Sequence, residues 1–352
     1  MSSGNRVWIV GAGGVGCVLG ARLELAHPGS VVFIDAWAEH VRTIQSDGLI
    51  VDHPEGPVQV RPAAVLLDHL DDLNGVPDLV VLAVKAYDTA EIIDRIQLHI
   101  GTAPVLSLQN SINEEHISTV LGADRTMGGV CLYSAGLLGP GHAVQAMAGG
   151  KIVIGELDGT VKPRTEHFAE LLRVSVPVRI SDNIWGELWT KLVRNAMVNG
   201  MAAATDLGMG ELVLVPGADR ICIGLGSEAV RVAVALGHRT LVTEDLFDCP
   251  YEYPLEWYLR PVGSVERNQL EQSFHDSWVP HPTVYPSLLQ DMRKGRRTEI
   301  EALNGYVADK GHQLGLPTPL NRALTDLVLQ CSSAGTFGDP GTVCKTLLPL
   351  VG

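Results

Sequence analysis

The glycine-rich segment GAGGVG at residues 11–16 restricts the fold of this chain more than any other feature. It directly follows an apolar run, Arg6–Val10, that is typical of a buried strand, and it opens a helical pattern over Val15–Leu25. In a strand–turn–helix unit such glycines permit a tight turn, close approach to a pyrophosphate and close helix packing. The segment therefore predicts a dinucleotide site at a helix N-terminus, formed by Gly11, Ala12, Gly13, Gly14, Val15 and Gly16. The alternative is a glycine-rich turn without a ligand.

Short apolar runs alternate with helical patterns through the first half of the chain. The predicted strands are 6–10, 31–35, 79–84 and 105–107, and the predicted helices between them are 15–25, 38–47 and 88–100. Residues 49–52 and 58–61 flank the sequence DHPEGP, which predicts a hairpin-like detour. A less regular β region follows and ends at Lys151–Gly155. Near-continuous apolar strands that alternate with helices predict an α/β domain with a doubly wound parallel sheet.

Strand patterns largely vanish after about residue 180. Helical patterns cover residues 184–204, 219–236, 285–314 and 319–331. The chain has 352 residues, which at about 150 residues per domain predicts two domains. We expect an α/β domain at 1–180 and an all-α domain at 181–352. An aromatic segment at 247–282 interrupts the second domain; it either packs on the surface or another subunit, or forms a wall or lid of a substrate pocket.

Composition excludes several classes of partner. The formal net charge of −14 disfavours nucleic acids and anionic membranes, although a small anionic substrate can still bind a locally basic cleft. The six cysteines show no CxxC pair and no zinc-ligand spacing, so we expect reduced core residues and no metal site. No apolar stretch has the length of a signal segment or membrane span, which predicts a cytoplasmic protein.

Asp35 ends the second predicted strand, 19 residues after Gly16. A carboxylate at this point accepts both hydroxyls of an adenosine ribose and repels a 2′-phosphate, so it favours NAD over NADP. Arg42 lies nearby in the sequence and keeps NADP open. The alternative for Asp35 is a solvated strand end.

Lys191, Asn195 and Asn199 recur at every fourth position of the sequence ELWTKLVRNAMVN. Each four-residue step on a helix turns by only about 40°, so these three side chains share a narrow face. One ammonium and two amides within an apolar stretch suit a small oxygen-rich molecule, whose carbonyl the lysine can protonate or polarise. The alternative is an exposed polar stripe.

A second segment with functional character runs from Tyr285 to Gly305. Pro286 and Ser287 suit the start of a helix. A basic cluster follows, which either attracts an anion or forms a solvated face: Arg293, Lys294, Arg296 and Arg297.

Taken together, five motifs resemble the ketopantoate reductase (2-dehydropantoate 2-reductase) family over about residues 6–330. They are GAGGVG, AVKAYD around Lys85, LQN at Asn110, ELWTKLVRNAMVN and PSLLQDMRKGRRTEIEALNG. The resemblance implies a Rossmann domain followed by a helical domain. It also implies hydride transfer between a nicotinamide cofactor and the 2-position of a small carboxylic acid, and it leads us to expect a homodimer.

The resemblance also assigns roles to individual residues. Lys191 matches the proton donor, whereas substrate contacts are implied for Asn110, Asn195, Asn199, Ser287 and Gln290. Lys85 and Asn110 match cofactor-side residues that face the reaction centre. Glu299 lies 12 residues after Ser287, which is about 18 Å along an unbroken helix, so we assign it to a cofactor ribose rather than to the acid.

Four positions depart from the family pattern. Asp35 replaces an arginine, Ser111 replaces the glycine after Asn110, Gly200 replaces the proline after Asn199, and Met209 replaces a substrate-contacting asparagine. These departures leave two alternatives to a 2-oxo acid reductase. One is an NAD-dependent enzyme that reduces another ketone or an imine, and the other is a non-catalytic dinucleotide-sensing protein.

Overall fold

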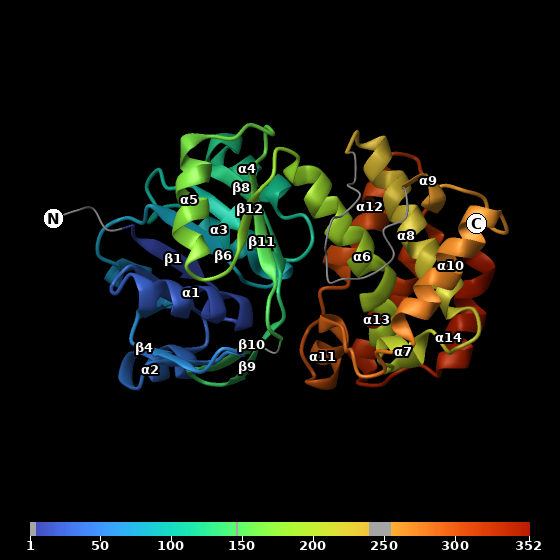
Figure 1. The fold of residues 1–352 in the computed structure, drawn as a ribbon, viewed down its shortest axis with the longest axis horizontal. Helices are drawn as coiled ribbons and strands as arrows, with labels where there is room; N and C mark the ends of the chain where they lie inside the picture. Colours follow the sequence, from blue (N-terminus) through green and yellow to red (C-terminus); the bar gives the residue numbers. More distant parts are fainter. Residues whose placement is uncertain (1–4, 146, 239–254) are drawn as a thin grey trace. The chain divides into compact units, whose positions relative to one another are not determined.

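The computed structural model describes residues 5–145, 147–238 and 255–352, which divide into two compact units, 1–188 and 189–352 (Figure 1). Helix α6, Ile184–Thr205, begins in the first unit and continues through the second. A functional boundary near residue 180, just before this helix, stays our proposal.

The first unit contains an eight-stranded sheet in the order β12-β11-β8-β7-β6-β1-β2-β5. The strands are β1 Val7–Val10, β2 Val31–Asp35, β5 Ala63–Leu66, β6 Leu79–Leu82, β7 Val105–Ser107, β8 Thr126–Leu132, β11 Lys151–Glu156 and β12 Val178–Ile180. Val7 of the central strand pairs with Val31 on one side and with Leu79 on the other. All neighbours are parallel except β8 and β11, so the predicted doubly wound parallel sheet is confirmed.

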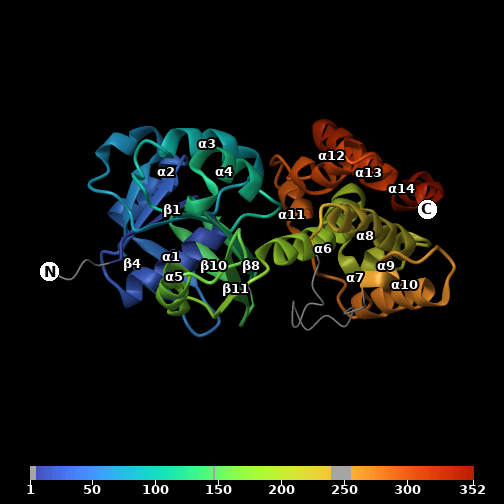
Figure 2. The same ribbon diagram turned by 90° about the horizontal axis from the view of Figure 1, so that it is seen from above.

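Apolar side chains on both faces of the strands explain why the sheet is covered on both sides. Val7 and Ile9 share a core with α1 (Gly14–Ala26) and α5 (Pro163–Arg173). Trp8 and Val10 share a second core with α3 (Thr89–Ile96) and α4 (Glu114–Leu121). Figure 2 shows these two helix layers on opposite sides of β1. Successive residues of a strand point to opposite faces, so continuous apolar runs fill both cores.

A smaller four-stranded sheet, in the order β4-β3-β10-β9, also belongs to the first unit. Its strands are β3 Leu49–Asp52, β4 Val58–Val60, β9 Ala135–Gly139 and β10 His142–Gln145. The predicted hairpin is confirmed, since β3 and β4 pair antiparallel with Leu49 opposite Val60. Strand β3 lies between β4 and β10, and β9 pairs with the other side of β10. Helix α1 packs against all four strands. Helix α2, Ala38–Ser46, follows β2.

The described part of the second unit is mostly helical, as predicted. Its elements are α7 Met209–Leu212, α8 Ala218–Ala235, α9 Leu255–Tyr258, α10 Val265–Trp278, α11 Ser287–Arg293, a π-helical turn at Glu301–Gly305, α12 Tyr306–Gln313, α13 Pro319–Ala334 and α14 Pro340–Leu347. Helix α8 is buried along most of its length, and α10, α12 and α13 pack against it. The predicted continuous helix over 285–314 is wrong, because the chain leaves the helix after Arg293 and Gly295 has a φ of +62°.

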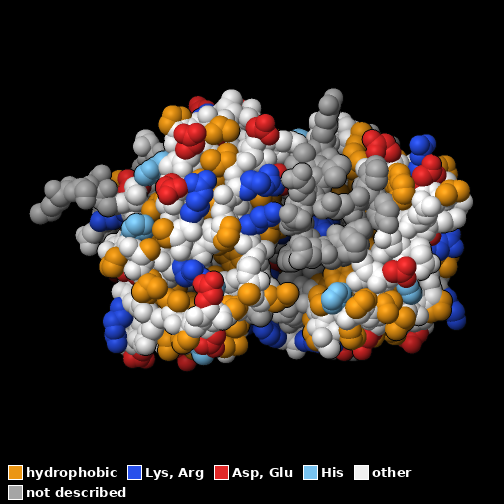
Figure 3. All heavy atoms as spheres, viewed as in Figure 1, with side chains coloured by type: hydrophobic (Ala, Val, Ile, Leu, Met, Phe, Trp, Pro, Cys, Tyr) orange, Lys and Arg blue, Asp and Glu red, His pale blue; other side chains and the backbone are white. Residues whose placement is uncertain are grey.

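Three further observations on the described residues concern membrane-spanning helices, cysteines and surface charge. Within them, no helix is long and apolar enough to cross a membrane. Five cysteines are buried and free, as expected, whereas Cys249 lies outside the described residues. On the face seen in Figure 3, basic side chains are interspersed with acidic ones despite the net charge of −14. Local charge therefore differs from the overall balance.

Candidate active site

The glycine-rich loop lies at the carboxyl end of β1 and leads into α1. Gly11 has a φ of +99°, and a β-carbon there would lie only 2.6 Å from the backbone nitrogen of Val84. A β-carbon on Gly16 would lie 2.2 Å from the carbonyl oxygen of Gly11. At Gly13, by contrast, a β-carbon would meet nothing within 4 Å. A β-carbon on Gly14 would lie 2.5 Å from the backbone nitrogen of Gly136, so the loop is tightly packed at three of its glycines and open only at Gly13. That open space lies beside the N–H groups of the first turn of α1 and fits a phosphate group.

The side chain of Asp35 binds the backbone of this loop. The Ala12 N–H donates to one carboxylate oxygen at 2.7 Å, and the Trp37 N–H donates to the other at 2.8 Å. A carboxylate offers about four acceptor positions, so the half-buried side chain can still accept two ribose hydroxyls. Arg42, the basic residue that kept NADP open, is exposed on α2.

Two buried side chains support the loop from α1 and α2. The Cys17 thiol donates to the carbonyl oxygen of Ala12 at 3.1 Å, and burial raises the pKa of this thiol, so it stays protonated. Nδ1 of His40 accepts the Gly141 N–H at 2.9 Å. Burial lowers the pKa of His40, although the nearby Asp35 carboxylate opposes that shift. A neutral imidazole thus fills the space behind Cys17.

Lys85 and Asn110 follow β6 and β7, which are adjacent parallel strands. Lys85 precedes a short 3₁₀ turn, Ala86–Asp88, whereas Asn110 lies in the turn before α4, and both side chains are half-buried. Carboxyl ends of parallel strands lie at one edge of a sheet, so both turns share the edge that carries the glycine-rich loop. The switch of strand order between β1 and β6 at this edge is where doubly wound sheets bind ligands.

In the second unit, α6 carries Lys191, Asn195 and Asn199 on one face, as their spacing predicts. Lys191 and Asn195 are half-buried, and Asn199 is buried. Nδ2 of Asn199 donates to the carbonyl oxygen of Asn195 at 3.2 Å. The face is therefore partly sheltered from water and does not fit a simple solvated stripe.

Ser287 is brought next to this face. It begins α11, and its hydroxyl donates to Oδ1 of Asn199 at 3.3 Å. The sequence separates these two residues by 88 positions, so this contact joins the two motifs expected to hold the acid.

Gln290 and Glu299 lie differently from one another. Gln290 is exposed, and its amide donates to the carbonyl oxygen of Tyr285 at 2.8 Å. Glu299 is buried and follows the break after α11. The distance estimate that gave Glu299 to the cofactor assumed an unbroken helix, and the turn at Gly295 makes that assumption wrong. Its cofactor role now stands on the family resemblance alone.

The departures at Gly200 and Met209 have structural counterparts. A β-carbon on Gly200 would lie 2.7 Å from Cδ2 of Leu324 and 3.1 Å from Cδ1 of Ile300. Met209 is fully buried, and its N–H donates to the carbonyl oxygen of Val284 at 3.0 Å. Both positions are thus occupied by close packing within the second unit.

The described part of the aromatic segment packs on its own unit. Helix α10 lies against α8, and Phe274 is fully buried. At its end, the carbonyl oxygen of His281 accepts the Gly210 N–H at 3.1 Å. Tyr251 and Tyr253 lie outside the described residues, so the choice between surface packing and a pocket wall stays open for them.

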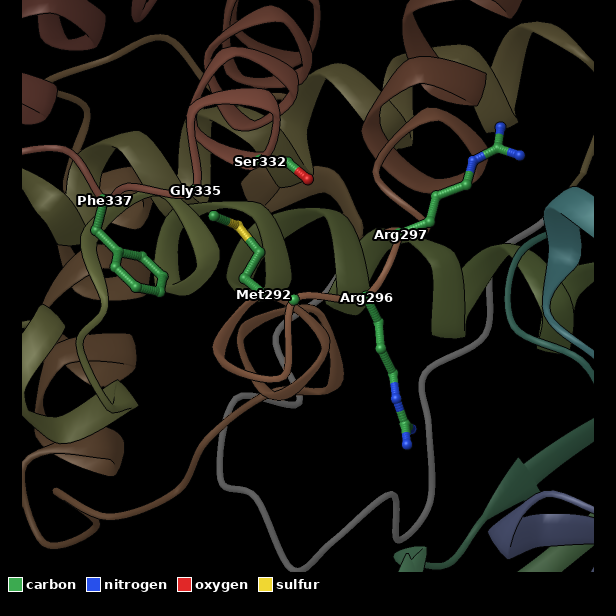
Figure 4. Close-up of a pocket in the computed structure, with 7 residues that line it drawn as sticks. Met292, Arg296, Arg297, Ser332, Gly335 and Phe337 are labelled. Carbon is green, nitrogen blue, oxygen red and sulfur yellow. The ribbon is translucent and has the colours of Figure 1, made fainter. Parts of the chain in front are cut away.

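Two of the four residues of the basic cluster form surface ion pairs. Arg293 pairs with Asp206 at 2.6 Å, and Arg297 pairs with Glu301 at 3.1 Å. A cavity of about 130 Å³ opens beside the cluster, but Figure 4 shows the side chains of Arg296 and Arg297 pointing away from Met292 and Ser332. The cavity is lined by Met292, Gly295, Arg296, Arg297, Ser332, Gly335 and Phe337. None of the residues assigned to the cofactor or to the acid lines it, and the side chains of Arg296 and Arg297 leave it, so we assign it no ligand.

Four buried polar residues around Lys85 and Asn110 were not singled out from the sequence: Thr89, Gln109, Asn113 and Glu114. Burial raises the pKa of Glu114 to about 7, and its Oε2 accepts the Asn113 N–H at 3.0 Å. A run of polar residues directly after the buried strand β7 was the available indication. No group of metal-ligating side chains occurs within residues 5–145, 147–238 and 255–352.

Known proteins match both units. Residues 7–159 match the family described as Ketopantoate reductase PanE/ApbA, and residues 183–331 match Ketopantoate reductase PanE/ApbA C terminal. The chain is similar to the 2-dehydropantoate 2-reductase of Archaeoglobus fulgidus, with 28% identity over 92% of this chain and 97% of that protein. The enzyme of the same name from Halobacterium salinarum is also 28% identical, over 92% and 97% of the two chains.

Two solved structures have similar folds. D-mandelate dehydrogenase with NADH and anilino(oxo)acetate has a TM-score of 0.78 and 26% identity, over 94% of this chain and 99% of that chain. A PanE/ApbA family ketopantoate reductase from Ralstonia eutropha has a TM-score of 0.77 and 28% identity over the same shares.

Proposed function

Because the chain belongs to the ketopantoate reductase PanE/ApbA family, we propose that it transfers a hydride between NAD and the 2-position of a small 2-oxo or 2-hydroxy acid. As a member of that family it is an NAD(P)H-dependent oxidoreductase that acts on CH–OH groups. The observation that carries the finer proposal is the hydrogen bond from Ser287 to Asn199. It joins the two motifs that the resemblance assigns to the acid, on the face of α6 that also carries Lys191 about two turns earlier.

In this proposal each polar group of α6 and α11 has one task. Bound nicotinamide supplies or accepts the hydride. Lys191 donates a proton to the oxygen that becomes an alkoxide, and its positive charge stabilises that oxygen as negative charge develops. Asn195, Asn199 and Ser287 orient the acid, with Gln290 one turn after Ser287 on the same helix.

The cofactor is assigned to residues of the first unit, and the family resemblance adds Glu299. The glycine-rich loop offers an open space and helix N–H groups for the pyrophosphate. Asp35 supports NAD, because its free acceptor positions suit ribose hydroxyls and its charge opposes a 2′-phosphate. Two structures of the similar D-mandelate dehydrogenase contain NADH, which supports the same choice. Lys85 and Asn110 face the nicotinamide end, and Asn110 also contacts the acid.

Two relatives suggest candidate acids. The curated relatives are named for 2-dehydropantoate, and the similar solved structure is named for D-mandelate. Met209 and Gly200 depart from the ketopantoate reductase pattern within the substrate unit, so we propose a 2-oxo acid whose side chain differs from that of 2-dehydropantoate.

A matrix of initial rates tests the proposal. NADH and NADPH are each combined with 2-dehydropantoate and other 2-oxo acids, and NAD is combined with D-mandelate, while nicotinamide absorbance is followed. We expect turnover with at least one acid and a higher kcat/KM with NADH. Turnover only with imines or unrelated ketones would favour the alternative substrate class. Tight NADH binding in calorimetry without any turnover would favour a dinucleotide-sensing protein.

We also propose a homodimer in the cytoplasm. The expectation of a dimer comes from the family resemblance and from the aromatic segment at 247–282. Light scattering of the purified protein measures its mass directly, and a monomer mass across the accessible concentration range would contradict the dimer.

A further inference from the structure

The turns that follow β6 and β7 are joined by a chain of buried side-chain hydrogen bonds. Ser107 Oγ donates to Gln109 Oε1 at 3.3 Å, and Gln109 Nε2 donates to Thr89 Oγ1 at 2.8 Å. Thr89 Oγ1 in turn donates to Asn113 Oδ1 at 3.2 Å. Asn113 Nδ2 then donates to the carbonyl oxygen of Asn110 at 2.7 Å. The chain therefore ends on the main chain of a residue expected to face the nicotinamide.

All donors in this chain point the same way. Gln109 Nε2 also donates to the carbonyl oxygen of Val84 at 3.1 Å, which uses both of its protons and leaves its oxygen for Ser107. The single hydroxyl proton of Thr89 lies between Asn113 Oδ1 and the carbonyl oxygen of Ala86, the latter at 2.8 Å. The link from Thr89 to Asn113 is therefore the longer branch of a shared hydrogen bond, and the link from Gln109 to Thr89 is the shortest one between the two turns.

Thr89 is the point where the two turns meet. It begins α3 and is only 4% exposed. Its hydroxyl accepts from Gln109 and donates towards Asn113, both of which flank Asn110. In the turn after β6, the Thr89 hydroxyl donates to the carbonyl oxygen of Ala86, and Gln109 donates to that of Val84. These two carbonyl groups belong to the residues immediately before and after Lys85.

We propose that Thr89 is a positioning residue that fixes the spacing between Lys85 and Asn110, and through them the nicotinamide end of the cofactor. The inference rests on the proposed function, which gives Lys85 and Asn110 their roles. Thr89 itself touches neither cofactor nor acid in this proposal.

Loss of the Thr89 hydroxyl affects both turns at once. It leaves a buried amide donor on Gln109 and a buried acceptor on Asn113 without their partners, so the two turns must shift or admit water. A displacement of about 1 Å at a reacting centre can lower a rate by about 10²-fold. The effect should therefore fall on kcat more than on the KM of the acid.

Three variants separate this role from a merely structural one. Thr89→Val keeps the shape and removes the hydroxyl, whereas Thr89→Ser keeps the hydroxyl and removes a methyl group. Thr126→Val is the matched control, because Thr126 is fully buried and its Oγ1 donates to a carbonyl oxygen, that of Gly122 at 3.0 Å, outside both turns. With NADH and 2-dehydropantoate, or NAD and D-mandelate, we expect Thr89→Val to lower kcat by about 10- to 100-fold. Thr89→Ser and Thr126→Val should stay within about 3-fold of the wild type, well below that displacement effect.

Amide hydrogen exchange of the full chain gives a readout besides activity. Thr89→Val should speed exchange in residues 84–89 and 109–113 together, and Thr126→Val should leave both segments unchanged. Equal kcat in Thr89→Val and Thr126→Val, with exchange unchanged in both segments, would overturn the inference. A wild-type protein that neither binds NADH nor turns over would instead overturn the proposed function, and exchange would still show whether Thr89 joins the two turns.

Discussion

The Asp35 carboxylate at the end of β2 holds the backbone of Ala12, whose N–H donates to it at 2.7 Å. The residue expected to select the cofactor is therefore also a support of the loop expected to bind the phosphates. The Cys17 thiol holds the other side of the same residue through the Ala12 carbonyl oxygen. Changing Asp35 thus alters charge and loop geometry together, and an experiment on cofactor preference has to separate the two.

Replacement of this carboxylate should shift cofactor preference. We expect Asp35→Ala to lower the ratio of kcat/KM for NADH to that for NADPH by about 10- to 100-fold, since charge-assisted hydrogen bonds are each worth about 1.5–3 kcal/mol. Asp35→Arg should shift the ratio further towards NADPH by adding a partner for the 2′-phosphate. Initial rates with both cofactors measure the ratio.

Asp47→Ala serves as the control for Asp35, because Asp47 is an exposed acid just after α2 in the same unit. Its ratio should equal that of the wild type. Loss of activity with both cofactors to the same extent in Asp35→Ala would show that only loop support was removed, and the preference for NAD would then need another origin.

Lys191 should carry the proton transfer. Lys191→Ala is expected to lower kcat by at least ~10²-fold, the usual contribution of general acid catalysis, while the KM for NADH changes little. Lys345→Ala, at an exposed lysine of α14, removes the same charge elsewhere in the second unit and should leave kcat unchanged. An unchanged kcat in Lys191→Ala would remove the assigned role.

The strands of the main sheet could be predicted because their own residues carry the pattern. Val7–Val10 and Leu79–Leu82 are apolar on both faces, which only a doubly covered sheet requires. The place of β3 and β4 could not be predicted, since β3 pairs with β10 about 90 residues later, His142 opposite Ile50. No local pattern specifies such a partner.

The helix predicted over 285–314 shows a second limit of sequence patterns. The residues 287–293 and 301–313 are both helical, but the chain between them turns at Gly295, where the Gly295 and Arg296 N–H groups donate back to carbonyl oxygens of α11 at 2.9 Å. The ion pair of Arg293 with Asp206 holds the end of α11 before this turn. The spacing of Lys191, Asn195 and Asn199, within one unbroken helix, was reliable for their shared face. The contact of Ser287 with Asn199 and the hydrogen-bond chain through Thr89 join distant segments and need the folded structure.

Ser111 has a φ of +72°, in the left-handed region where the family pattern has glycine. This conformation costs a residue with a β-carbon about 1–2 kcal/mol, whereas glycine loses about 0.5–1 kcal/mol of chain entropy, so Ser111→Gly should stabilise the first unit slightly. Ser118→Gly, within α4, should instead destabilise it by about 0.5–1 kcal/mol. Urea unfolding compares the two, and equal losses in both variants would show that Ser111 is unstrained.

Glu114 should make stability depend on pH. Burial raises its folded-state pKa to about 7 from an ordinary value of 4.5, so the folded protein binds the proton more tightly than the unfolded chain. Its contribution to stability is complete below pH 4.5 and is lost as the pH rises towards 7. Glu114→Gln, which resembles the neutral acid, should match the wild type at low pH and exceed it above pH 7 by about 3 kcal/mol at most.

Thermal unfolding of both proteins from pH 4 to 8 measures this difference and cancels the other titrations. A difference that stays constant with pH would show that Glu114 is ionised in the same range in both states. Glu115→Gln, which removes a half-buried carboxylate from the neighbouring position on α4, provides the control for the loss of one charge.

Gly200 is required by packing rather than by backbone conformation. A β-carbon there would lie 2.7 Å from Cδ2 of Leu324, so Gly200→Ala should destabilise the second unit by about 1–3 kcal/mol, despite the better helix propensity of alanine. Proline, the family residue at this position, adds the loss of a helical N–H and should cost about 3 kcal/mol or more. Both losses are measured by urea unfolding.

A double-mutant cycle tests the reason for that loss. In a Leu324→Ala background, the same Gly200→Ala change should lower the free energy of unfolding by at least about 1 kcal/mol less than in the wild type, because the colliding Cδ2 atom of Leu324 is gone. Gly341→Ala is the control, since a β-carbon at this exposed position of α14 meets only Asp339 Oδ1 at 3.6 Å. Equal costs of Gly200→Ala in both backgrounds would place the origin of the loss in α6 itself. In that case the contact of residue 200 with α13 would not explain why glycine replaces the family's proline.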